Sequence, residues 1–295
     1  VSADQVLLGM PMAQYLATKA LSSGLCHRIL TESPLHARLD SPWNDNRVQD
    51  SSNVADTGSA AHKMLLEGTE DGIEVIDAPD WRTKAAKEAR DLAYAQGRIP
   101  MLAGKIEPVR DMVDAARDFI AGSELQGILD DGESEVTLLF EMAAIECKAR
   151  CDRLKADRSI VLSYKTTKAS ANPESWIRTQ LPQYDIATVF YQHAVDLACG
   201  VKGTRCIHLI QEQDYPYACS LVGLDPAYQA LSEMRLARAL DLWRQCTESR
   251  NWPAYPNRIC WAEPKAWQQA AAEEQAASDD SAFFTDKELE GGIPL

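Results

Sequence analysis

The spacing of apolar residues changes near the middle of the chain, and this change predicts two kinds of structure. Helical spacing occurs in four segments of the first half, 22–30, 56–67, 81–96 and 108–121. Alternation typical of strands follows in 135–142, 145–154 and 159–167, which we interpret as a meander. Later segments predict helices at 173–199 and 225–243, and strands at 205–211 and 218–222, and a short strand is predicted earlier, at 73–77. This mixture predicts an α/β protein with helices packed around a sheet.

The segment between the first two helices, residues 33–46, contains two Ser-Pro steps and is predicted to be a turn-rich connector. No linker or repeat interrupts residues 1–275, so we expect one domain there. Residues 276–295 are acidic and carry Gly and Pro, which favours a mobile tail.

Composition and charge narrow the function classes. No apolar run reaches the roughly 18–20 residues that span a bilayer, so no membrane contact is expected. The eight cysteines show no CxxC spacing, which indicates free thiols in a cytoplasmic protein. The net charge of −14 argues against nucleic-acid binding by the whole surface, but it permits a local basic channel.

Residues 147–167, CKARCDRLKADRSIVLSYKTT, carry the strongest chemical signal. We interpret them as a β-hairpin with Asp152 near the end of the first strand and Lys165 on the second. A carboxylate there can hold Mg²⁺ or Mn²⁺, the backbone carbonyl of Tyr164 can join it, and a lysine can orient an attacking water. An ordinary cross-strand pair of Asp152 and Lys165 is the alternative.

Further candidates surround this hairpin. His62 lies in an otherwise apolar helix and is either a metal ligand or a core histidine. Glu146 shares a strand face with Asp152, because six residues separate them, and could assist a metal. Glu135 and Glu141 are interpreted as solvated strand acids. Two explanations fit the downstream residues Gln180, Gln183, Tyr184 and Tyr191 equally well. They either brace a phosphate or Lys165, or they belong to an ordinary amphipathic helix.

Several fragments together resemble a known family. They include ALSSGLCHRILTESPLHARL, TGSAAHKMLLEG, CKARCDRL, SYKTTKASANPESW and QLPQYDIATVFYQHAV, in the family's order. Over roughly residues 10–275 the chain resembles phage and prophage nucleases of the PD-(D/E)XK superfamily related to RecE, exodeoxyribonuclease VIII. The resemblance implies a restriction-endonuclease-like core, in which helices flank a mixed β-sheet.

The resemblance also implies roles for individual residues. His62 matches the metal-binding histidine, Asp152 the metal carboxylate and Lys165 the catalytic lysine, while Tyr191 matches the tyrosine of a QxxxY motif. Two positions depart from the pattern: Ser163 stands where the family has Asp or Glu, and Ala187 where it has Gln. Three explanations compete for the serine. It is an engineered change, Glu146 replaces the missing ligand, or the protein is a natural degenerate nuclease.

The function implied is a divalent-metal-dependent exonuclease that degrades linear double-stranded DNA in phage-type recombination and passes a single strand to an annealing protein. The group forms ring-shaped homo-oligomers. Four cations are therefore candidates for a basic lining: Lys148, Arg150, Arg153 and Lys168. The alternative is a pseudonuclease that binds DNA ends or a partner without cleavage.

Overall fold

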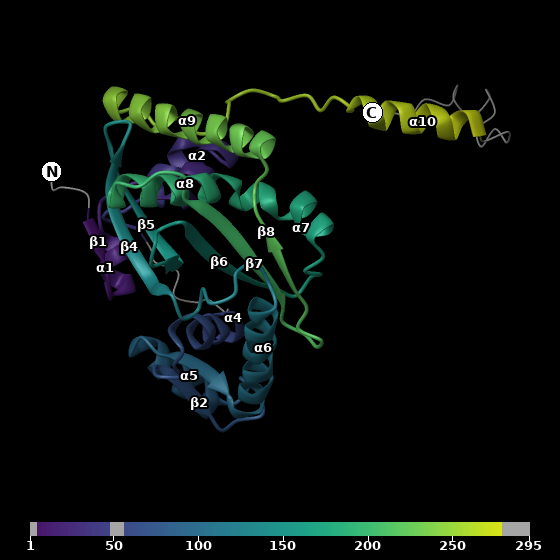
Figure 1. Cartoon of the computed structure of the whole chain (residues 1–295). Coiled ribbons are helices and arrows are strands. Elements are labelled where there is room, and N and C mark those ends of the chain that lie inside the picture. Colours follow the sequence, from purple (N-terminus) through teal and green to yellow (C-terminus); the bar gives the residue numbers. More distant parts are fainter. Residues whose placement is uncertain (1–4, 48–55, 279–295) are drawn as a thin grey trace. The chain divides into compact units, whose positions relative to one another are not determined.

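A computed structural model describes residues 5–47 and 56–278. The chain divides into two units, residues 1–254 and 255–295, each described by itself. The larger unit contains a six-stranded mixed sheet in the order β1-β4-β5-β6-β7-β8 (Figure 1). Its strands are β1 (Gln5–Leu7), β4 (Gly132–Met142), β5 (Ile145–Lys155), β6 (Ile160–Thr167), β7 (Arg205–Glu212) and β8 (Cys219–Val222). β6 and β7 are parallel, and the other neighbours are antiparallel.

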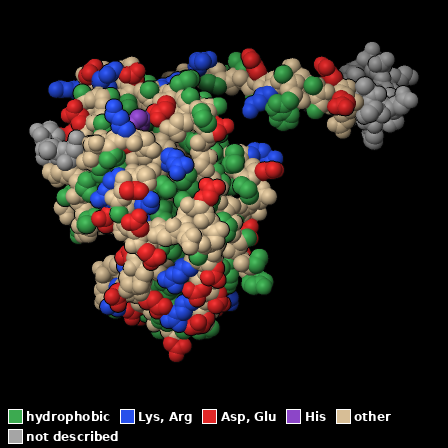
Figure 2. Space-filling view, viewed as in Figure 1, with side chains coloured by type: hydrophobic (Ala, Val, Ile, Leu, Met, Phe, Trp, Pro, Cys, Tyr) green, Lys and Arg blue, Asp and Glu red, His purple; other side chains and the backbone are tan. Residues whose placement is uncertain are grey.

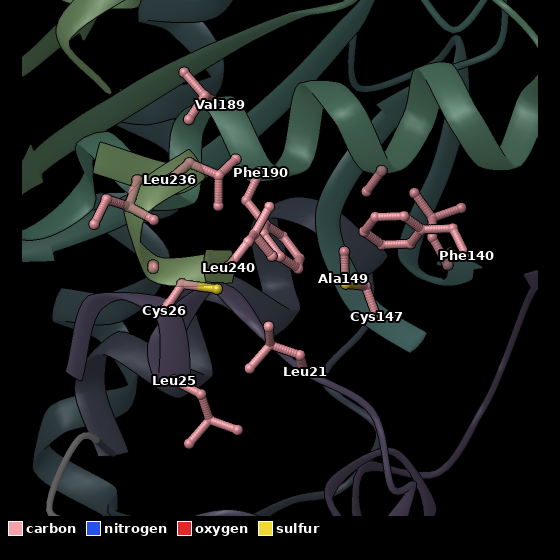
Figure 3. Close-up of a cluster of buried hydrophobic side chains, with 14 of the residues drawn as sticks. Leu21, Leu25, Cys26, Phe140, Cys147, Ala149, Val189, Phe190, Leu236 and Leu240 are labelled. Atoms are coloured by element: carbon pink, nitrogen blue, oxygen red, sulfur yellow. The ribbon is translucent and has the colours of Figure 1, made fainter. Parts of the chain in front are cut away.

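Helices α2 (Ser23–Thr31), α8 (Leu181–Cys199) and α9 (Pro226–Ser249) stack over one face of this sheet (Figure 1). Their apolar side chains meet those of β4 and β5 in a buried cluster (Figure 3). At its centre Phe190 of α8 and Phe140 of β4 are in edge-to-face contact, with ring centroids 5.5 Å apart. Three shorter helices also belong to the larger unit: α1 (Met12–Ala17), α3 (Pro34–Leu39) and α7 (Pro173–Thr179).

A smaller layer covers the other face. Helix α4 (Asp56–His62) continues into a π-helical turn, η1 (Lys63–Glu67), and α6 (Ala103–Ala121) packs beside it. Two strands of this layer, β2 (Ile73–Ile76) and β3 (Ile99–Leu102), pair with each other in parallel. Helix α5 (Lys84–Ala95) connects them in the sequence. Strand alternation gives β6 a role in both cores: Val161 packs under α8, while Leu162 and Tyr164 face α4 and α6.

The predicted fold class is confirmed, and so are the meander and the helices that flank it. Three element predictions were wrong. Residues 34–39 are helical because the Ser33 hydroxyl accepts the N–H of His36 and Pro34 occupies the first turn, so this Ser-Pro step starts a helix. Pro182 at the start of α8 divides the predicted helix 173–199. Helix α6 begins at Ala103 rather than at 108.

The second unit contains helix α10 (Ala266–Ser278). The rest of the acidic tail lies outside the described residues. Within the described ranges, no helix has the length and apolar character needed to cross a membrane.

Candidate active site

The strands β5 and β6 separate at the residues that the sequence singled out. They are paired at Arg153 with Leu162 and at Leu154 with Val161. The next pair in this register, Asp152 and Ser163, lies where β6 leaves β5 and continues alongside β7. We call this point the fork of β5 and β6. Here the Tyr164 N–H donates to a side chain of β5: it reaches Oδ2 of Asp152 at 3.0 Å.

Three side chains, two from β6 and one from α4, converge on the Asp152 carboxylate. The Ser163 hydroxyl donates to Oδ2 at 3.1 Å, and Lys165 Nζ donates to the same oxygen at 3.3 Å. His62, the last residue of α4, has its Nε2 3.7 Å from Oδ1. The structure therefore brings His62, which is distant in the sequence, together with Asp152, Ser163 and Lys165.

Charges decide the protonation of this group. Burial alone would raise the pKa of Asp152, but the Lys165 ammonium and the His62 imidazole outweigh it and hold the pKa well below its usual range. Burial opposes the charge on Lys165, yet Asp152 raises the pKa of that lysine above its ordinary value. The same two effects act on His62. Burial lowers the pKa of its imidazole, but the Asp152 carboxylate raises it more, so the pKa lies above its ordinary value. Asp152 and Lys165 are thus an ion pair at neutral pH.

Glu135 is a site residue that the sequence analysis placed in solvent. It lies opposite Asp152 in the pairing of β4 with β5, between the pairs Ser134–Arg153 and Val136–Cys151. Its φ of 56° is rare for a residue with a side chain. Its Oε1 lies 3.4 Å from Nδ1 of His62, and its carboxylate forms an ion pair with Arg150. Strand register was the signal that could have identified it.

Glu146 lies elsewhere. It is exposed at the turn end of β5 and is paired with Glu141 of β4. The alternation argument selected the correct face, but six residues at about 3.3 Å each separate Glu146 from Asp152 by about 20 Å. The structure therefore does not bring Glu146 to the site, and it is not the replacement for the acid missing at Ser163.

Residues around the fork line a cleft of about 850 Å³. Its wall includes His62, Glu135, Asp152, Lys165 and Tyr191. Burial raises the pKa of Tyr191 well above its ordinary value, so its phenol keeps the proton at neutral pH.

A side chain of α8 contacts the ammonium of Lys165. The ring of Tyr184 lies 5.8 Å from its ammonium, within the range of a cation–π contact. Trp176 of α7 stacks on that ring at 5.7 Å. The aromatic pair restricts the side chain of Lys165.

The donors at the fork suit a hard divalent cation in kind. Carboxylate oxygen, a backbone carbonyl and an imidazole nitrogen are ligands that Mg²⁺ and Mn²⁺ accept. They fall short in number: in the described ranges, no three His, Cys, Asp or Glu side chains are grouped as a metal site would group them. Ser163 is the reason on β6, and on β4 the carboxylate of Glu135 is turned toward Arg150.

Two of the four cations predicted to line a DNA path are interior. Lys148 is 3% exposed and donates to the backbone carbonyls of Tyr15 and Thr18, and burial lowers its pKa to about 8. Arg153 is 7% exposed and bonds the carbonyl of Ile128. The prediction was wrong for these two, because segments distant in sequence cover them.

The surface seen in Figure 2 mixes basic and acidic side chains and shows no broad basic face. Of the four predicted cations, Lys168 is the exposed one, and Arg150 is held by Glu135.

The fold and the fork define the class: a PD-(D/E)XK-like domain. Residues 19–262 match the family described as "PDDEXK-like domain of unknown function (DUF3799)", and the chain belongs to this family. No curated protein matches the chain.

A solved structure of a proposed exonuclease from Eubacterium rectale is similar at 12% identity, with a TM-score of 0.51. The match covers 90% of this chain and 99% of that one, and at this identity it shows the fold. A second structure, of SSO0001, has 16% identity and a TM-score of 0.28 over 67% of this chain and 89% of that one, which is too low to carry an argument.

Proposed function

We propose that this protein is a divalent-metal-dependent nuclease that degrades linear double-stranded DNA from its ends. The observation that carries the proposal is the Asp152–Lys165 ion pair in the fork of β5 and β6, with His62 beside it. The family of PDDEXK-like domains and the fold shared with a proposed exonuclease support it.

Asp152, His62 Nε2 and the carbonyl of Tyr164 would hold the cation. When bound, the cation would neutralise charge on the phosphate and lower the pKa of a water. Lys165 keeps its proton and is placed to orient the attacking water and to stabilise negative charge on the phosphate. The Tyr191 phenol, on the cleft wall, keeps its proton and would donate a hydrogen bond to the phosphate. Glu135 orients His62 through Nδ1, as carboxylates do for metal-binding histidines.

The proposal extends to phage-type recombination because residues 10–275 resemble RecE-related nucleases. In that role the enzyme would act in the cytoplasm of a bacterial host as a ring-shaped homo-oligomer. It would leave a single strand for an annealing protein.

Ser163 favours a second candidate function, that of a pseudonuclease. Its hydroxyl, the N–H of Tyr164 and the ammonium of Lys165 all donate to one oxygen of Asp152. A carboxylate satisfied in this way gains less from a cation than two adjacent carboxylates would. Such a protein would bind DNA ends or a partner without cutting.

The test is degradation of end-labelled linear duplex DNA with Mg²⁺ or Mn²⁺. Asp152→Asn should lower the cleavage rate by about 10³-fold, because it removes the anionic ligand of the cation and the partner of Lys165. Asp241→Asn, at an exposed position on α9, is the matched control and should cleave normally. DNA that is bound but not cleaved by the unmodified protein would favour the pseudonuclease instead.

A further inference from the structure

A second cavity, of about 540 Å³, adjoins the cleft. Gly58 of α4 and Thr166 of β6 line both cavities, so the second begins one residue beyond Lys165. Its other walls include Lys105 at the start of α6, Lys168 after β6 and Trp81 before α5. No Asp or Glu side chain within the described residues lines it, in a chain with a net charge of −14.

The two lysines differ from other cations of the same layer. Arg98 is paired with Glu74, and Arg110 with Glu70. Lys105 and Lys168 are exposed, and neither forms an ion pair with a side chain that the structure describes. The N-cap position of α6, Leu102, offers no side-chain acceptor, which adds to the positive potential beside Lys105. A cavity of this charge favours an anionic ligand.

The walls of the cavity also suit a base and a sugar. Trp81 presents an indole, which the Arg90 guanidinium orients from 5.9 Å. Aromatic rings of this kind stack on bases whatever their sequence. In the same lining, the Gln213 amide donates to the Thr166 hydroxyl at 2.9 Å, a polar edge within reach of a ligand.

Gly58 lies where the two cavities meet. A Cβ at this position would lie 2.7 Å from the Thr166 hydroxyl oxygen, closer than such atoms approach. The absence of a side chain there lets α4 pass close to β6 beside the cleft. Phosphates bound beside Lys105 and Lys168 would thus lie just across this contact from the fork.

We propose that this second cavity binds a single nucleic-acid strand next to the phosphate at the fork, with Lys105 and Lys168 on phosphates and Trp81 on a base. The proposal deepens and rests on the nuclease function above. A volume of about 540 Å³ is that of a small-ligand site, so it admits a short stretch of one strand rather than a duplex.

The test measures binding without cleavage. The fluorescence anisotropy of a labelled thymidine oligonucleotide is followed in EDTA at several salt concentrations. The double variant Lys105→Ala/Lys168→Ala should bind about tenfold more weakly, and its salt slope should fall by about 1.4, or about 0.7 for each phosphate contact. Trp81→Ala should weaken binding at least about fivefold, and Trp81→Phe should restore most of it. Lys202→Ala removes another exposed lysine, which lines neither cavity, and should bind normally.

Two outcomes overturn the proposal. Either the cavity variants match Lys202→Ala in affinity and salt slope, or the unmodified protein has no affinity for the strand. The metal-supplied cleavage assay is read separately. If cleavage depends on Asp152 and the cavity variants bind normally, only the second cavity is misassigned. If those variants lose binding and no protein cleaves, the cavity stands and the nuclease proposal fails.

Discussion

The core under α8 and the fork of β5 and β6 are built from the same strands on different principles. Cys151 is fully buried among apolar side chains, while its neighbour Asp152 accepts hydrogen bonds from three donors. In the core, shape alone fixes Phe140 and Phe190. At the fork, charge and hydrogen bonds fix each position. Stability is therefore concentrated in the first region and chemistry in the second, and substitutions should separate them.

The largest effect should come from breaking the core. Phe190→Ala should lower the free energy of unfolding by about 3–5 kcal/mol, because it removes a fully buried ring and leaves a cavity. Urea denaturation measures this. Phe190→Leu should lose less, and the cleavage rate per folded molecule should not change in either variant. A normal stability for Phe190→Ala would mean that the core does not dominate the fold.

Changing the fork should alter chemistry first. Ser163→Asp places a second carboxylate where a hydroxyl now lies 3.1 Å from an oxygen of Asp152. Without metal the like charges should lower the melting temperature, and Mg²⁺ or Mn²⁺ should raise it again. The cleavage rate should increase by about 10²-fold. Ser163→Asn is the control of similar size. A melting temperature of Ser163→Asp that does not respond to metal would contradict a cation at the fork.

His208 connects the two regions and should give the protein a pH dependence. It is 1% exposed, its Nε2 lies 2.8 Å from the Thr188 hydroxyl, and burial lowers its pKa to about 3. An unfolded histidine, with a pKa near 6.5, takes up a proton first as the pH falls. His208 should therefore cost no stability above about pH 6.5 and reduce it by up to about 1.4 kcal/mol per pH unit below that, toward pH 3.

The measurement is the unfolding free energy of the unmodified protein and of His208→Gln between pH 4 and 8. The variant should show a shallower decline below pH 6.5. Equal slopes in the two proteins would mean that other groups account for the acid sensitivity.

The smallest effect should be at Glu146. Because it is exposed at the far end of β5, Glu146→Gln should leave the cleavage rate unchanged and stability within about 0.5 kcal/mol. Glu135→Gln, which removes the partner of both His62 and Arg150, is the matched comparison and should lower cleavage. A reduced rate in Glu146→Gln alone would reverse the placement of the two acids.

The sequence was informative where local pattern decides structure. Alternation predicted the meander. Motif spacing selected Asp152 and Lys165, and the apolar setting of His62 together with the family resemblance added that histidine; the fold brings all three together. It was uninformative where distant segments decide. Glu135 depends on the register of β4 and on an unusual φ, and Lys148 is interior because residues 15–18 cover it. Parity along a strand gives the face of a residue and not its distance from the site, which is why Glu146 was selected.

The π-helical turn η1 after His62 carries one residue more than an α-helix of the same rise would need. Each residue of an α-helix turns the chain by about 100°. A deletion within residues 63–67 would thus rotate everything that precedes it, including the imidazole that points at Asp152. The additional residue changes the rotation of the helix between His62 and the residues after it. Met64, Leu65 and Leu66 can therefore all be buried while the His62 imidazole still points at Asp152. Length variation in this helix is consequently constrained even where residue type is free.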